Sequence, residues 1–124
     1  MGASRLGLAL VLALGLAGCG EARGGPTPSV PGGSATRGRV LLGAYGCVNC
    51  HMIPGVEGAN GTVGPPLIVW SRRTYIAGAL PNTPDNLIRW IQNPQAIEPG
   101  TAMPYLGVSR AQAADMAAYL YTLE

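Results

Sequence analysis

The apolar residues of the chain fall into one unbroken run, residues 6–16, and three segments with a helical period. Those segments lie at about 36–49, at 84–92 and from 109 to the end of the chain, and each gathers apolar residues on one face. The connections between them, of which 95–107 is an example, lack this period and are rich in Gly and Pro, which predicts irregular loops. The pattern therefore predicts an all-α domain of short helices.

Local signals mark the ends of the second and third segments. Thr83 is a good N-cap and is followed by a proline at the first helical position, while the Asn93-Pro94 pair ends that helix. Ser109 opens the last helix, and Gln112 three residues later completes a capping box. We expect this last helix to continue to the end of the chain.

The apolar run at 6–16 predicts export. It follows Arg5, is short for a membrane-spanning helix, and ends in Leu16-Ala17-Gly18-Cys19, which resembles a bacterial lipobox. We therefore predict that residues 1–18 are a lipoprotein signal peptide and that Cys19 is lipidated; the alternative is an ordinary signal peptide with an incidental cysteine. The prediction implies an exported protein, lipid-anchored to a bacterial membrane and facing the periplasm or the cell exterior.

Residues 19–35 are predicted to be a lipid-anchored, Gly/Pro-rich linker. Most of this stretch has no apolar period and cannot bury a core of its own. With a lipid at one end and a folded domain at 36–124 on the other, a tether is the favoured interpretation. A flexible terminus without that role is the alternative.

Composition narrows the possible functions. With 124 residues there is room for one domain, and the formal net charge is only +2. All the cationic residues are arginines and the charge is nearly balanced, which argues against nucleic-acid binding. Phe is absent and aromatic residues make up 6% of the chain, so a buried apolar cofactor would supply much of the missing core.

The sequence Cys47-Val48-Asn49-Cys50-His51 is the attachment pattern of c-type haem. Each thiol adds across one vinyl group of haem, and residues three apart on a helical turn share a face. His51 then reaches the iron from the proximal side. If Cys19 carries lipid and the other two cysteines carry one covalent haem c, no cysteine is left for a disulfide.

A second axial ligand is expected to be a methionine. His51 is the only histidine and lysine is absent, so four methionines remain. Met1 is removed with the signal peptide, Met52 is on the proximal side, and Met116 lies on a core-facing helical stripe. Met103 lies in an extended Pro/Gly loop that can cover the opposite face of haem. An open distal position is the alternative.

Several motifs together resemble the class I c-type cytochromes, over about 36–124. The motifs are Cys47 to His51, Gly64-Pro65-Pro66-Leu67, Asn93-Pro94 before Pro99-Gly100, Thr101-Ala102-Met103-Pro104 and Ala118-Tyr119-Leu120. Residues 80–103 are particularly similar to the cytochrome c domain fused to subunit II of some haem–copper oxidases. The resemblance implies the class I fold, with three to five short helices around one covalently bound haem and with the terminal helices crossing.

The resemblance also implies roles for individual residues. Cys47 and Cys50 would hold haem, with His51 and Met103 as the axial metal ligands. A proline carbonyl near His51 could accept its Nδ1–H, and the resemblance gives this role to Pro65. The remaining assignments are Arg73 and Thr101 at a haem propionate, Trp90 on the haem wall, and Gly38 and Leu42 meeting Tyr119 and Leu120 at the helix crossing.

These features predict an electron-transfer protein and not an enzyme. We expect a membrane-tethered carrier in a respiratory chain that receives electrons from a quinol-oxidising complex or a dehydrogenase and passes them to a terminal oxidase. A fixed electron-entry subunit of an oxidase or dehydrogenase complex is the main alternative. A haem peroxidase or a redox or gas sensor would need an exchangeable distal site, which Met103 would block. No small-molecule substrate and no nucleic acid is expected.

Overall fold

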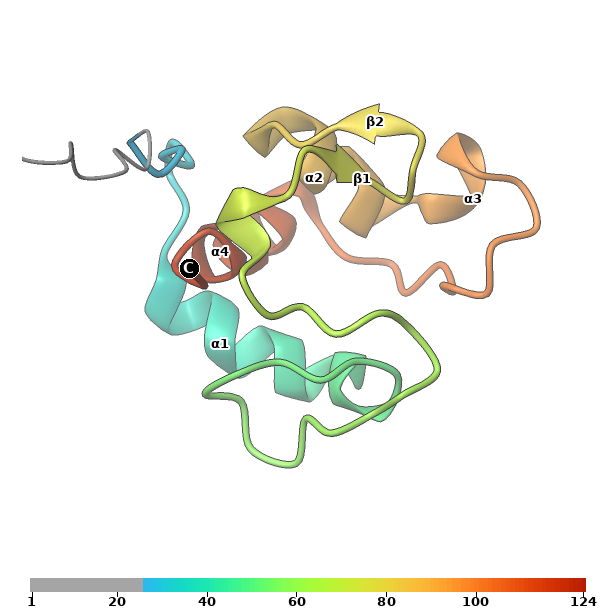
Figure 1. Cartoon of the computed structure of the whole chain (residues 1–124), viewed down its shortest axis with the longest axis horizontal. Helices are drawn as coiled ribbons and strands as arrows, with labels where there is room; N and C mark the ends of the chain where they lie inside the picture. The colour runs from blue at the N-terminus through green and yellow to red at the C-terminus, as the bar shows by residue number, and fades with distance from the viewer. Residues whose placement is uncertain (1–25) are drawn as a thin grey trace, which may run out of the picture.

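The computed structural model describes residues 26–124, so the predicted signal peptide, Cys19 and the first part of the predicted linker lie outside the described residues. Four α-helices, two short 3₁₀ helices and one two-stranded ladder make up this region (Figure 1). In chain order they are α1 (Ala35–Ala44), η1 (Cys47–Asn49), η2 (Trp70–Arg72), β1 (Tyr75–Ile76), β2 (Leu80–Pro81), α2 (Pro84–Gln92), α3 (Pro94–Ile97) and α4 (Arg110–Leu120). The predicted helical fold is confirmed, with the small ladder as an addition.

The first helix is shorter than predicted. Ser34 caps α1 by accepting a hydrogen bond from the backbone N–H of Arg37, and the helix ends at Ala44. Gly46 then adopts a left-handed conformation with φ 74°, which stops the helix, and the chain resumes as the separate turn η1. The predicted helix through residue 49 is therefore wrong in its last part.

The start of α2 agrees with the prediction, but the residue that ends it also begins a further helix. The Thr83 side chain accepts a hydrogen bond from the N–H of Asn86, and Pro84 is the first helical residue. Asn93 ends α2, and its side chain also accepts a hydrogen bond from Ala96 and so caps α3. The predicted loop over 95–107 therefore begins with one helical turn, which we did not predict.

The last helix has the predicted capping box, in which Ser109 and Gln112 bond to each other's backbone. It ends at Leu120, and a turn closes the chain, with the N–H of Thr122 donating to the carbonyl of Tyr119. The expectation that this helix continues to the end of the chain is therefore wrong.

The terminal helices cross at Gly38. A Cβ atom built there would run into the carbonyl oxygen of Asp115 and would lie 3.0 Å from the Cα of Met116. Only glycine allows the two backbones to approach this closely. The crossing was predicted, but its nearest partners lie one turn before the expected Tyr119 and Leu120.

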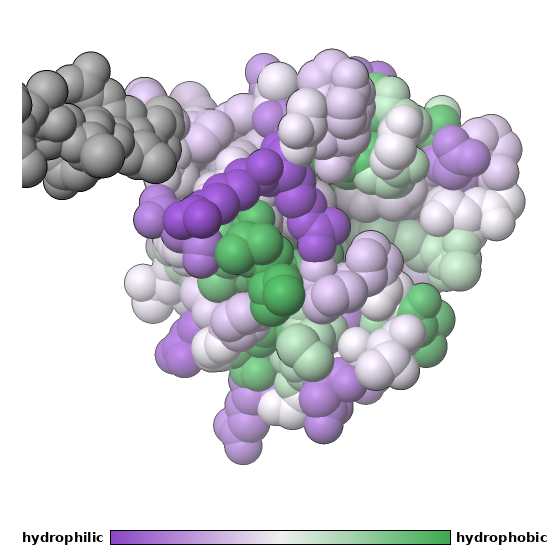
Figure 2. Space-filling view, in the orientation of Figure 1, coloured by the Kyte–Doolittle hydropathy of each residue, from purple (hydrophilic) through white to green (hydrophobic). Residues whose placement is uncertain are grey.

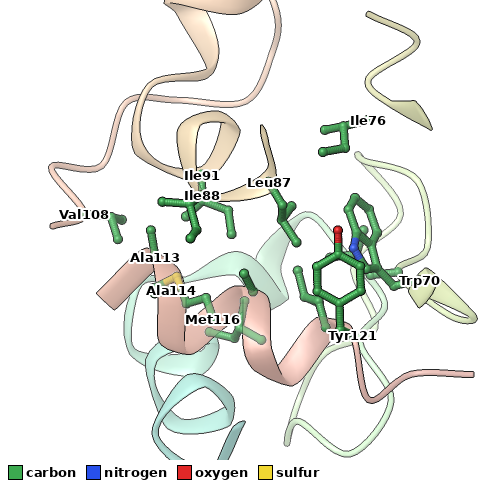
Figure 3. Packing of buried hydrophobic residues seen from close by; sticks show 14 of the residues in the cluster. Trp70, Ile76, Leu87, Ile88, Ile91, Val108, Ala113, Ala114, Met116 and Tyr121 are labelled. Atoms are coloured by element: carbon green, nitrogen blue, oxygen red, sulfur yellow. The ribbon is translucent and has the colours of Figure 1, made fainter. Parts of the chain in front are cut away.

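The core lies between α1, α2 and α4. Figure 3 shows its side chains converging from α2 and α4, with Trp70 and Ile76 joining from the segment that precedes α2. Met116 and Ala117 of α4 are completely buried, and Leu42 of α1 is 3% exposed. The buried phenol of Tyr121 donates to Asn82 at 2.8 Å, and burial raises the pKa of Tyr121 to about 12. Tyr121, which follows α4, therefore belongs to the same core as the buried side chains of the helices.

The end of the predicted linker lies against α4. Val30 packs on the core, and the N–H of Ser34 donates to a carboxylate oxygen of Asp115 at 2.7 Å. Arg37 donates twice to the same carboxylate, at 2.8 Å each. These hydrogen bonds hold the pKa of Asp115 below its usual value. None of the helices within residues 26–124 is long and apolar enough to cross a membrane.

Candidate haem-binding site

The two cysteines lie on one tight turn. Cys47 begins η1, and its carbonyl accepts hydrogen bonds from the N–H groups of Cys50 at 3.2 Å and His51 at 3.0 Å. Side chains three apart in a 3₁₀ helix point in nearly the same direction. Both thiols are half-buried and free of disulfides. Burial raises the pKa of the Cys47 thiol. The turn therefore presents two thiols on one side, as attachment of one haem requires.

His51 is oriented by the segment around Pro65. Its Nδ1 lies 2.7 Å from the carbonyl oxygen of Pro65, the residue to which the family resemblance gives this role. Since a carbonyl only accepts, Nδ1 carries the proton in this bond, and in the neutral ring Nε2 is then the nitrogen with the lone pair. The backbone of this segment is itself fixed, because the N–H of Gly64 donates to Cys50 at 2.8 Å and that of Leu67 donates to Met52 at 2.8 Å.

Gly64 is part of the site and was not assigned a role from the sequence. A Cβ at this position would lie 2.7 Å from Nδ1 and 2.9 Å from Nε2 of His51. The backbone of Gly64 thus packs directly against the imidazole and limits how the ring can tilt. Its position before the two prolines could have indicated this role, since a glycine allows another group to approach the backbone closely.

Met103 lies half-buried in the connection between α3 and α4. Its carbonyl accepts a hydrogen bond from Nε2 of Gln95 at 3.1 Å, and its N–H donates to Oγ1 of Thr101 at 3.4 Å. In Figure 1 this loop and the turn with the cysteines both lie to the right of α1 and α4. Gln95 was missed by the sequence analysis, and only its position next to the Asn93-Pro94 stop could have drawn attention to it.

The other predicted haem contacts have defined positions in the protein. Arg73 donates to the carbonyl of Pro66, and its guanidinium lies 5.1 Å from the ring centroid of Trp70. Trp90 is half-buried and packs against the core, directly before the buried Ile91 in α2. The hydroxyl of Thr101 accepts the N–H of Met103, and its carbonyl accepts a hydrogen bond from Gln95 of α3. Their contacts with haem stay predictions.

This donor set fits haem c. Two free thiols stand one turn apart, and the adjacent imidazole has its Nδ1 engaged and its Nε2 available. Those are the groups that two thioether bonds and one axial bond need.

Comparison with known proteins agrees with this chemistry. The family model for cytochrome c matches residues 35–124. The chain belongs to the cytochrome c family. Covalent haem c and a role in electron transfer follow from this membership, and Cys47 and Cys50 lie in the CxxCH attachment region.

Two relatives of this cytochrome differ in how much of their length it covers. It is 36% identical to cytochrome c2 of Rhodopila globiformis over 109 residues, which is 77% of this chain and 99% of that protein. It is 35% identical to cytochrome c oxidase subunit 2 of Alkalihalophilus pseudofirmus over 92 residues, which is 73% of this chain. The chain spans only 26% of that subunit, so the activity and partners of the whole subunit do not transfer directly.

Proposed function

We propose that this cytochrome is a membrane-tethered, monohaem electron carrier of a respiratory chain, with His51 and Met103 as axial ligands. The observation that carries the proposal is the bond between Nδ1 of His51 and the carbonyl of Pro65 at 2.7 Å. It leaves Nε2 free to bind iron and holds the ring in one orientation. When bound, haem supplies the one-electron couple of its iron.

The choice of Met103 is supported by the positions of the other methionines. Met116 has 0% exposure and fills the core, whereas Met52 follows His51 directly and is 44% exposed. Met103 is half-buried in a loop whose backbone is hydrogen-bonded in place. A His/Met ligand pair favours a high reduction potential, which suits delivery of electrons to an oxidase.

A terminal oxidase is the proposed acceptor, and a quinol-oxidising complex or a dehydrogenase the proposed donor. Similarity to an oxidase subunit 2 supports the acceptor. Large apolar side chains are exposed in the loop after His51 and in the loop after Met103, among them Val69, Tyr105 and Leu106. Figure 2 shows a hydrophobic patch beside hydrophilic side chains, with further hydrophobic areas elsewhere on the same face. Docking through apolar contact and arginines, aided by a tether, fits a surface without lysine.

The axial ligand is tested by substituting Met103→Ala and, as a control, Met52→Leu. The oxidised Met103→Ala protein should lose the far-red sulfur-to-iron absorption band, and its midpoint potential should fall. The Met52→Leu protein should retain both. An unchanged spectrum and potential in Met103→Ala would show that another group, or none, binds the second axial position.

The tether is tested by Cys19→Ser in the full chain. This variant should leave the membrane fraction, and oxygen uptake by oxidase-containing membranes should slow because the effective concentration of the carrier falls. The isolated variant should keep the spectrum and potential of the original protein. Retention in the membrane fraction would contradict the predicted lipidation.

The similarity to subunit 2 also favours a second candidate, a fixed electron-entry subunit of an oxidase. Purification of the anchored form in mild detergent separates the two. Stoichiometric recovery of oxidase subunits would support the fixed subunit, and recovery of the cytochrome alone would support the carrier.

A further inference from the structure

The side chain of Gln95 holds the loop that carries Met103. Its Nε2 donates to the carbonyl of Thr101 at 2.7 Å and to that of Met103 at 3.1 Å. Its Oε1 accepts the N–H of Gly100 at 3.1 Å. One amide thus uses both of its donor hydrogens and its acceptor on three backbone groups of a single loop.

The backbone of Gln95 is held in place by its neighbours. It belongs to the single turn α3, which starts at the fully buried Pro94. Asn93 caps this turn by accepting a hydrogen bond from Ala96 at 3.2 Å. Because its backbone is fixed at the core, the amide of Gln95 can position the loop instead of moving with it.

The loop has few other hydrogen bonds. Within the described region, no backbone-to-backbone hydrogen bond involves residues 102–108. Residues 104–107 are exposed, so little packing holds them. Besides the one bond from Gln95, the only hydrogen bond of Met103 within residues 26–124 is the long bond from its N–H to Oγ1 of Thr101, at 3.4 Å. The path of the loop past Met103 therefore depends strongly on one side chain.

We propose that Gln95 is a positioning residue that sets how readily Met103 leaves the iron. The inference rests on the proposed axial role of Met103. In the closed loop, the amide fixes the backbone at Gly100, Thr101 and Met103 and so confines the thioether to one place. Without it, the loop samples open states at a small cost, and an external ligand competes more easily for the iron.

The test measures the affinity of the oxidised holoprotein for imidazole, together with its unfolding in urea. In Gln95→Ala, imidazole should bind about tenfold more tightly, since the three hydrogen bonds of the amide no longer favour the closed loop. The midpoint of global unfolding should move little. Gln92→Ala is the matched control, and it should bind imidazole as the original protein does.

Gln95→Glu separates hydrogen bonding from packing. The glutamate is nearly isosteric and keeps the acceptor for Gly100, but it loses both donated bonds and places a carboxylate against two carbonyl oxygens. We expect imidazole to bind at least as tightly as in Gln95→Ala. Imidazole affinity equal to that of the original protein in Gln95→Glu would overturn the proposal. So would a rise in affinity that merely follows a loss of global stability.

Failure of the ligand assignment is distinguishable from failure of this inference. If Met103→Ala keeps the far-red band, the axial role is wrong and the inference falls with it. If Met103→Ala loses the band while both Gln95 variants bind imidazole like the original protein, the ligand assignment stands and only the role of Gln95 is refuted.

Discussion

The crossing of α1 with α4 and the loop that carries Met103 are held together in different ways. At the crossing, Gly38 lets two backbones touch, and the surrounding side chains are buried. In the loop, hydrogen bonds to the side chains of Gln95 and Thr101 fix the backbone as far as Met103, and the next four residues, 104–107, are exposed. Packing of this kind is lost only when the whole domain unfolds, whereas a few hydrogen bonds open locally. The fold and the proposed ligand can therefore be weakened separately.

The largest expected effect is a loss of stability from a substitution at the crossing. Gly38→Ala places a methyl group where the carbonyl of Asp115 and the Cα of Met116 stand, and neither backbone can move aside without separating the helices. We expect a loss of about 3 kcal/mol or more in the free energy of unfolding, measured in urea.

Gly43→Ala is the control for that substitution, because it lies in the same helix. A Cβ there meets only Val56, at 3.9 Å. The helix propensity of alanine should then stabilise the protein by about 0.5–1 kcal/mol. Equal losses in both variants would mean that the crossing is not the critical contact.

The second expected effect is a pH dependence at the crossing. Because the hydrogen bonds from Arg37 lower the pKa of Asp115, this carboxylate contributes stability above its usual pKa of 3.8, and that contribution is lost progressively as the pH falls from there through the lower pKa of the folded state. Asp115→Asn should therefore be less stable than the original protein at pH 7, by less than Gly38→Ala, and the difference should shrink at pH 3.

Urea midpoints at the two pH values measure this difference. Asp85→Asn is the control, because Asp85 pairs with Arg110 at 3.0 Å but its side chain is 81% exposed. It should change the midpoint little at either pH. A constant difference between Asp115→Asn and the original protein would mean that the carboxylate acts by shape alone.

The third expected effect concerns a hydrogen bond between α4 and the loop that leaves His51. The phenol of Tyr119 on α4 donates to the carbonyl of Pro54, in the loop that leaves His51, at 2.6 Å. Tyr119→Phe should cost about 1 kcal/mol in unfolding free energy. Tyr75→Phe, at a residue that is 58% exposed, should cost almost nothing. No difference between these two variants would show that this bond adds nothing to the native state.

The helix starts could be predicted because they depend on local chemistry. Thr83 and Ser109 accept backbone hydrogen bonds three residues on, and these partners are fixed by spacing alone. A bond from His51 to a proline carbonyl could be anticipated too, since a metal-binding histidine needs an acceptor, and the family resemblance indicated Pro65.

The predictions that failed concern features that residue spacing alone does not determine. Asn93-Pro94 ends one helix, but the same two residues also suit the start of the next. The position of the crossing was missed by one turn, because residues a turn apart share a helix face and periodicity cannot distinguish them. Gln95 was missed because its partners are backbone atoms, whose identity depends on the path of the loop and not on the residues in it.

The smallest expected effect is confined to the loop. The Oγ1 of Thr101 accepts the N–H of Met103 at 3.4 Å, a long hydrogen bond, so Thr101→Val should raise the affinity of the oxidised protein for imidazole only two- to fivefold, or ~0.5–1 kcal/mol. Global unfolding should not change. Thr62→Val, at an exposed threonine in another loop, should change neither the imidazole affinity nor the unfolding.

A change in Thr101→Val that is limited to the pH dependence of the midpoint potential would instead favour the propionate contact implied by the family resemblance. A shift in imidazole affinity without a shift in unfolding would show that this loop opens independently of the crossing, which is the difference between the two regions.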